Sequence, residues 1–435
     1  MPEGEKRGIN WAPLWKEEDW WAVWFGFILI ILVAIGWITK VPKIGKWSTS
    51  LGQAIPASNL FPLLLLLIGI GILTAIGIKA MGLDVRKYLL AFPVVFILAV
   101  IAMLIGGHAL AKAYNLEVPL WALIVGLLVS NTVGTPQWLQ PAVRTEMYIK
   151  TGLVLLGCEI LFHRIVALGP PGLMVAWIVT PIVLIFMYWF GVRILKIESK
   201  EFALTLSAAT SVCGVSAAIA TGAACRAKKE EVSMAIGLSL LFTVIMLVLF
   251  PFIVKASGMD VDVGAAWIGG TIDSTGAVVA AGAMLGDRGL QIASVVKMIQ
   301  NVLIGIIAFV VAVIWVWKVD RDPNAPRPSA MEIWIRFPKF VIGFVLASII
   351  FSFIFVPGFG EKAVGAMTGS TKALRGWFFA LAFVSIGLSS NFKEMAKYLK
   401  GGKPVWQYII GQGFNVILTF IVAWIAFSGH YLPKP

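Results

Sequence analysis

Long apolar runs recur along the sequence from about residue 20 to residue 428. A membrane-spanning helix needs about 20 predominantly apolar residues, and about thirteen segments of the chain approach that length. Charged residues make up 13% of the 435 residues, whereas soluble domains carry about a quarter. The sequence therefore predicts an all-α polytopic membrane protein without a separate soluble domain.

The net charge of +13 does not indicate a nucleic-acid partner, because the lysines and arginines are scattered over short loops between the apolar runs. Basic loops of this kind follow membrane topology and contact anionic lipid. Lysines and arginines are more numerous in the loops on the side of the N-terminus than in the loops on the other side. This excess predicts a cytoplasmic N-terminus and a multi-pass protein of the cell inner membrane. We expect no cleaved signal peptide, because the first apolar run, 20–39, is long enough to span. The three cysteines form no CxxC pair, so neither a zinc site nor a disulfide framework is expected.

Residues 207–223, SAATSVCGVSAAIATGA, interrupt an apolar segment with small and hydroxylated side chains. Gly weakens a helix, and Ser and Thr compete for its backbone hydrogen bonds. A helix broken here would expose a half-helix N-terminus, which carries about half a positive charge and binds anions. Close helix packing is the alternative and better explains the alanines. The candidate anion ligands are Thr210, Ser211, Cys213, Gly214 and Ser216.

A second interruption, GTIDSTG at 270–276, places Asp273 between two apolar stretches. A charge near the bilayer centre costs roughly 2.5–3.5 kcal/mol, so Asp273 is the candidate carboxylate for coupling to H⁺ or Na⁺. The alternative role is a helix cap. Ser274, Thr275 and Gly276 are further candidate ligands. No metal or organic cofactor is expected.

Two lysines lie inside apolar segments. Lys297 has Asn301 four residues later, and it either pairs with Asp273 or faces the substrate. Lys150 follows Glu146 by four residues, so an intrahelical ion pair is the simpler interpretation. Both lysines and Asn301 are candidate coupling residues.

Two segments of the chain resemble each other in sequence, which suggests inverted repeats. KTGLVLLG at 150–157 and KMIQNVLIG at 297–305 each follow a Gly/Thr-rich interruption, and their offset of five segments gives the two copies opposite topology. The same offset pairs 207–223 with 378–392, where a second half-helix end, or else close packing, would involve Ser385, Gly387, Ser389 and Ser390. The first expected domain, 1–118, has an amphipathic N-terminal segment and about three accessory helices. The two repeats follow at 119–258 and 259–435, and a polar linker at 318–330 lies within the second repeat.

Five stretches resemble the sulfate exporter family of bacterial membrane proteins. They are YIKTGLVLLG (148–157), SVCGVSAAIAT (211–221), GTIDSTGAVVAAG (270–282), FPKFVIGF (337–344) and IGLSSNFKE (386–394). The resemblance implies membership of the bile-acid/arsenite/riboflavin transporter superfamily, with inverted five-helix repeats, two crossing broken helices and a homodimer. The charged run RAKKEE at 226–231 and Glu159 depart from the pattern; we expect Glu159 to reach the membrane interface.

The residues and the resemblance together predict a secondary active transporter that exports sulfate or a related small anion by elevator-like alternating access. The alternatives are a sodium-coupled importer of bicarbonate or a carboxylate, and a passive anion channel. An enzyme is not expected, because the sequence has no HExxH, GxSxG or GxxxxGK[ST] motif.

Overall fold

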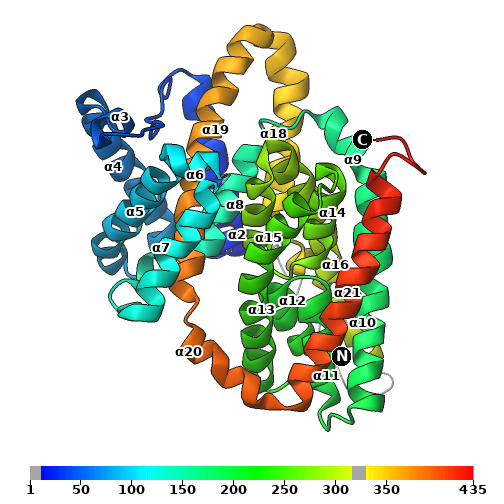
Figure 1. The fold of residues 1–435 in the computed structure, drawn as a ribbon. Helices are drawn as coiled ribbons and strands as arrows, with labels where there is room; N and C mark the ends of the chain where they lie inside the picture. The colour runs from blue at the N-terminus through cyan, green and yellow to red at the C-terminus, as the bar shows by residue number, and fades with distance from the viewer. Residues whose placement is uncertain (1–10, 115, 316–329, 435) are drawn as a thin grey trace, which may run out of the picture. The chain divides into compact units, whose positions relative to one another are not determined.

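The computed structural model describes residues 11–114, 116–315 and 330–434. These residues form helices joined by short loops and contain no β-strand, only an isolated bridge between Trp47 and His108 (Figure 1). Among them, seven helices are long and apolar enough to cross a membrane. A bilayer requires such helices because it offers no water to backbone groups. The predicted polytopic all-α membrane protein is thus confirmed, while the linker at 318–330, apart from Ala330, lies outside the described residues.

The chain contacts divide the protein into two compact units. The first unit contains Met1–Leu110, Thr135–Leu161 and Lys339–Ser385, and the second contains Ala111–Gly134, Phe162–Pro338 and Ile386–Pro435. Each unit therefore draws on segments far apart in the sequence. The domain bounds and the inverted repeats expected from the sequence stay predictions.

The first unit is built around α2, α4, α5, α8, α18 and α19. Its helices are α1 Pro13–Lys16, α2 Glu18–Ala34, α3 Leu51–Ala54, α4 Ala57–Ala80, α5 Val85–Gly107, η1 Gln140–Ala142, α8 Thr145–Leu156, α18 Lys339–Ile350, η5 Phe351–Phe355 and most of α19 Val356–Ser389; α6 Ala109–Ala113 straddles the boundary. Gly26 brings α2 against α8, because a Cβ there would lie 2.4 Å from Val154 Cγ1. Gly360, with φ at 78°, turns the chain between the two arms of the α18–α19 hairpin (Figure 1).

Glu159 does not reach the membrane interface, which corrects the expectation from the sequence. Its side chain is 7% exposed and its Oε1 lies 2.7 Å from Arg375 Nε, whose own side chain is 6% exposed. Arg375 also donates to Glu159 Oε2 at 3.0 Å. A buried carboxylate persists where a cation and hydrogen bonds compensate its lost hydration, so this pair belongs to the core of the first unit.

The second unit contains both broken helices. Its helices are α7 Val118–Thr132, α9 Phe162–Leu173, η2 Met174–Ile178, α10 Val179–Trp189, η3 Phe190–Ile194, α11 Lys200–Ser211, α12 Gly214–Ala224, α13 Lys229–Ala256, α14 Val261–Thr271, α15 Thr275–Met284, α16 Gly286–Ile314, α17 Met331–Arg336, α20 Phe392–Met395, η6 Ala396–Gly401 and α21 Lys403–Phe427. Asp260 caps α14 by accepting from the Asp262 N–H at 2.8 Å. A hydrogen bond from the Lys434 ammonium, 2.6 Å away, holds the pKa of Asp260 below its ordinary value.

Candidate functional site

Two helices of the second unit are interrupted where the sequence predicts. Between α11 and α12 the backbone leaves helical geometry at Val212 (φ −124°, ψ −76°) and Cys213 (φ −154°, ψ 114°). Between α14 and α15 it does so at 272–274, where Ile272 and Ser274 are extended. Each interruption creates one helix C-terminus with free carbonyls and one helix N-terminus with free amides. The predicted break at 207–223 is confirmed, and the polar interruption at 270–276 is also a break between two helices.

The two breaks touch each other. The Gly214 N–H donates to the backbone oxygen of Asp273 at 2.9 Å. A Cβ on Gly214 would lie 2.3 Å from Ser239 Oγ and 3.7 Å from Asp273 Cβ. Glycine at this position therefore leaves room for Ser239 of α13 beside the crossing of the two breaks, which supplies a packing reason for one of the small residues.

Lys297 on α16 holds the carbonyl ends of both breaks. Its ammonium donates to Val212 O at 2.5 Å, to Ile272 O at 2.8 Å and to Gln300 Oε1 at 2.7 Å. These bonds use all three protons of the ammonium group, and the residue is 1% exposed. The structure thus directs the hydrogen bonds of Lys297 to two backbone carbonyls and Gln300, and none of them to the Asp273 carboxylate.

Gln300, one helical turn later, supports the same two ends. Its Nε2 donates to Ser211 O at 3.0 Å and to Gly270 O at 3.1 Å. Each helix C-terminus carries about half a negative charge, so two of them together match the single charge of Lys297. The carbonyl side of the crossing is therefore buried, hydrogen-bonded and electrically balanced.

Asp273 is 1% exposed, and hydrogen bonds from the described residues reach only one of its two carboxylate oxygens. Its Oδ2 accepts from Tyr408 Oη at 2.6 Å and from Ser239 Oγ at 2.8 Å. Within the part of the chain that the structure describes, its Oδ1 is buried without a hydrogen-bond partner, as is Asn301 Oδ1. The Asn301 amide donates to Thr275 Oγ1 at 2.9 Å. Unsatisfied buried acceptors are uncommon in native proteins and suggest an additional proton, ion or water.

The amide side of the crossing is more open. Among the residues that the structure describes, no side chain caps the first turn of α12 or of α15. Ser216, in the first turn of α12, is exposed, and Ser274, immediately before α15, is half-buried. Cys213 and Thr275 are buried. The crossing is consequently asymmetric, with satisfied carbonyls on one side and uncapped amides on the other.

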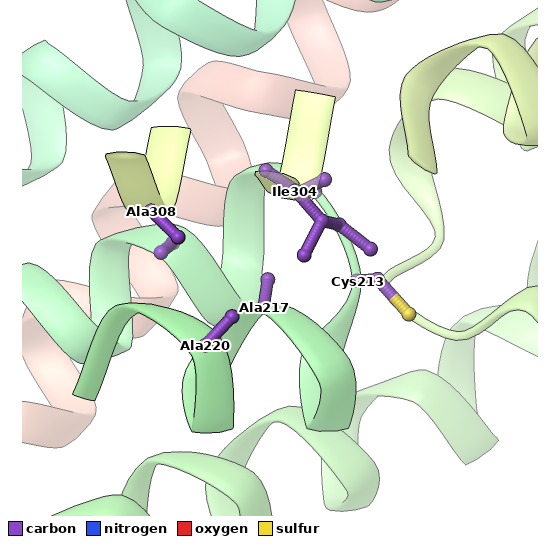
Figure 2. Close-up of a cluster of buried hydrophobic side chains, with 7 residues drawn as sticks. Cys213, Ala217, Ala220, Ile304 and Ala308 are labelled. Atoms are coloured by element: carbon purple, nitrogen blue, oxygen red, sulfur yellow. The ribbon is translucent and has the colours of Figure 1, made fainter. Parts of the chain in front are cut away.

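The alanines of the interrupted segment serve packing, as the alternative interpretation predicts. Figure 2 shows Ala217 and Ala220 of α12 facing Ile304 and Ala308 of α16 in one buried cluster. Thr210 is satisfied within its own helix, because its Oγ1 donates to Leu206 O at 3.0 Å. The remaining predicted ligands of this region, Ser211 and Gly276, are both buried, and the hydroxyl of Ser211 has no hydrogen-bond partner among the described residues.

Within residues 378–392 the helix ends only at Ser389, and the structure has no interruption before that residue. Helix α19 continues without interruption after Gly360 as far as Ser389. Ser385 Oγ donates to Leu381 O at 2.7 Å and leaves the helix intact. A Cβ on Gly387 would lie 2.4 Å from Leu123 O, so this glycine allows α7 to approach closely. The second broken helix is α14–α15.

The end of α19 is fastened to the end of α7. Ser130 Oγ lies 2.8 Å from Gly387 O and 3.0 Å from Ser390 O, and its one proton is shared between these two acceptors. The Asn391 amide donates to Ser130 O at 2.7 Å, and Asn131 accepts from Phe392 N–H at 2.7 Å. Gly387 and Ser390 thus have structural roles here, while Ser389 is exposed at the helix end.

Lys150 belongs to the first unit and is not among the residues that meet at the crossing. Its ammonium lies 2.6 Å from Asp19 Oδ1 and 3.1 Å from Glu146 Oε2. The intrahelical pair with Glu146 is therefore confirmed, and Asp19 adds a second partner from α2.

Several residues at the crossing were not predicted from the sequence. They include Gln300, Tyr408 and Gln412, and Gln412 Nε2 donates to Thr271 O at 3.0 Å. The sequence contains a signal for such residues. Polar side chains recur at spacings of four, three and four along an apolar helix, at Tyr408, Gln412, Asn415 and Thr419. That periodicity places them on one helix face.

Comparisons with known proteins identify the family. The family model described as conserved hypothetical protein 698 matches residues 89–408. A UPF0324 membrane protein of Rhodopirellula baltica is 56% identical over 89% of this chain and 71% of its own length. One from Nitratidesulfovibrio vulgaris is 50% identical over 88% of this chain and 69% of its length.

A more distant relative matches almost from end to end. A UPF0324 membrane protein of Nitrosomonas europaea is 30% identical over 96% of this chain and 97% of its own length. No solved structure matches the chain. The family match and these identities establish that the chain belongs to the UPF0324 family of membrane proteins.

Proposed function

We propose that this protein is a secondary active transporter, without enzymatic activity, that exports sulfate or a related small anion across the cell inner membrane. The observation that carries the proposal is the asymmetry of the crossing. Lys297 and Gln300 satisfy the carbonyl ends of α11 and α14, whereas the N-termini of α12 and α15 are uncapped. Uncapped helix N-termini bind anions through free amides and positive dipole ends.

Asp273 provides the coupling group in this proposal. Its backbone oxygen accepts from Gly214, the first residue of α12, so its carboxylate lies beside that helix N-terminus. A bound anion there would repel an ionised carboxylate. Protonation of Asp273 or cation binding to it therefore favours anion binding, and linkage makes the preference reciprocal.

An elevator-like movement fits the division of the chain into two compact units. Both broken helices, Lys297 and Asp273 belong to the second unit. A unit that holds a complete site can carry its substrate as one body, which is the requirement of alternating access.

The test is concentrative uptake of labelled sulfate into proteoliposomes under an imposed proton or sodium gradient. Wild type is compared with Asp273→Asn and with Glu198→Gln, a control at an exposed carboxylate of the same unit. Gradient-driven accumulation that is lost in Asp273→Asn and kept in Glu198→Gln supports the proposal. Flux that never accumulates substrate indicates a passive channel, and sodium-dependent uptake of bicarbonate or a carboxylate indicates the importer. Absence of flux for sulfate, sulfite, sulfonates, bicarbonate and carboxylates in folded protein contradicts transport of a small anion.

Ser216 tests the position of the substrate. Leucine at this exposed position would cover the first turn of α12, so we expect Ser216→Leu to abolish flux in a folded protein. Ala223→Leu, at an exposed position near the other end of α12, is the control. Unchanged transport by Ser216→Leu would remove this residue from the site.

A further inference from the structure

The first unit contains an elongated groove that the proposed transport does not use. Its volume is about 480 Å³, and its walls come from α2, the connector that follows α2, α4 and one residue of α19. Leu32, Pro62, Ile76 and Leu374 represent these walls. All but one of the lining side chains, Lys40, are uncharged, and most are aliphatic.

The groove follows a membrane-spanning helix. Pro62 and Ile76 are fourteen positions apart on α4, a distance of about 21 Å along a helix axis. Leu65 and Ile72, on the same helix, are 53% and 56% exposed. Because α4 is one of the candidate membrane spans, these side chains would face lipid. Because the groove follows this stretch of α4 and has a volume of only about 480 Å³, its cross-section is narrow.

Gly69 keeps the middle of the groove open. It lines the groove, and a Cβ built on it would meet nothing within 4 Å. Glycine costs a helix interior about 1 kcal/mol relative to alanine, and neither a turn nor a close helix contact explains its presence here. A side chain at this position would start in open space and extend into the groove.

One end of the groove is cationic. The connector carries Lys40, Lys43 and Lys46, all exposed, and the sequence has no acidic residue between Asp19 and Asp84. In the described ranges of the chain, none of these three lysines forms an ion pair. Trp37, also at this end, is 80% exposed, as expected of an indole at the level of lipid head groups.

We propose that this groove binds one acyl chain of an anionic phospholipid, with the lipid phosphate on Lys40. The apolar walls accept any hydrocarbon chain, so the discrimination between lipids comes from the cationic end. A lysine near an anionic lipid surface is worth about 1 kcal/mol, or about fivefold in affinity. Charge complementarity and the continuity of the groove with a lipid-facing helix favour this occupant over a second copy of the chain.

The experiment is native mass spectrometry of the purified full-length protein, titrated with phosphatidylglycerol or phosphatidylcholine of identical acyl chains. We expect tighter binding of phosphatidylglycerol to wild type. Lys40→Gln should reduce that preference about fivefold, and Gly69→Phe should abolish the tight site for both lipids. The controls are Lys79→Gln, an exposed lysine near the C-terminal end of α4, and Gly413→Phe, an exposed glycine of α21 with open space around its Cβ.

Two outcomes would overturn the proposal. One is equal binding of the two lipids to wild type, and the other is unchanged phosphatidylglycerol binding by both Lys40→Gln and Gly69→Phe. A wild-type dimer that Gly69→Phe converts to a monomer, without any lipid preference, would assign the groove to a second copy of the chain. Folding of each variant is checked by its thermal unfolding, so that lost binding is not mistaken for lost structure.

Discussion

Replacing Lys297 with methionine should destabilise the second unit strongly, although methionine is apolar and of similar length. The ammonium has no proton left for another acceptor, because its three protons go to Val212 O, Ile272 O and Gln300 Oε1. Methionine would leave two helix ends that together carry about one negative charge without compensation. Breaking a buried charge pair by removal of one partner costs about 3–5 kcal/mol.

The assay is thermal unfolding of the purified protein in detergent. A loss of about 3–5 kcal/mol corresponds to a fall in Tm of about 6–20 °C for a unit of roughly this size. Lys79→Met, at an exposed lysine near the end of α4, is the matched control and should change the unfolding free energy by less than about 0.5 kcal/mol. Gln300→Leu should also destabilise, by about 1–3 kcal/mol for each carbonyl that loses its donor.

A double-mutant cycle with Asp273→Asn decides between two roles for Lys297. If the lysine balances helix carbonyls, Lys297→Met lowers the unfolding free energy by nearly the same amount in wild type and in the Asp273→Asn background. If the lysine instead stabilises the Asp273 carboxylate, most of that cost disappears once the carboxylate is removed. A cost that vanishes in the Asp273→Asn background would refute the reasoning.

The next predictions concern close contacts and an ion pair in the interior of the protein. Gly214→Ala should push the start of α12 away from α13 and lower transport, because the new Cβ would lie 2.3 Å from Ser239 Oγ. Ser239→Ala in the same chain removes the clashing atom and should restore part of the flux, and a lack of rescue would contradict this contact. Gly387→Ala should lower the Tm, since its Cβ would lie 2.4 Å from a backbone oxygen, whereas Gly376→Ala in the same helix, with nothing within 4 Å, should leave it unchanged or raise it. Glu159→Gln should cost about 3–5 kcal/mol because it removes the carboxylate charge that faces the buried Arg375 guanidinium, and an unchanged Tm would show that the ion pair is dispensable.

The sequence predicts the helical membrane fold well because apolar length is a local property. It also locates both helix breaks, at 212–213 and 272–274, because Gly, Ser, Thr and Asp within an apolar span conflict with an uninterrupted helix. These are features that a short window of residues contains. Their positions agree with the structure to within a few residues.

The third small-residue segment, 378–392, shows where such reasoning fails. Its Ser and Gly content resembles that of 207–223, but Ser385 bonds back to its own helix and Gly387 makes room for α7. In both segments, glycine and serine have the same local preferences. The two segments differ in the helix that packs against them. Helix α16 brings Lys297 and Gln300 to the carbonyls of one segment, and the composition of a segment does not predict such a pair of donors. A break is stable only where another helix satisfies the freed groups, and that information is tertiary.

The charges at the crossing can be added, and their sum predicts the stoichiometry of coupling. Lys297 balances two helix C-termini of about half a negative charge each, which leaves two N-termini of about half a positive charge each. An ionised Asp273 would cancel those two and make the empty site neutral. An arriving anion would then add uncompensated negative charge in a buried place, unless Asp273 takes up one proton or cation at the same time. We therefore expect Asp273 to take up one proton or sodium ion with each anion, which balances a monovalent anion and half of the charge of the sulfate dianion. This uptake is measurable with a pH- or sodium-sensitive dye enclosed in the same proteoliposomes as labelled sulfate. Flux that moves neither ion in wild type would show that Asp273 does not balance the substrate charge.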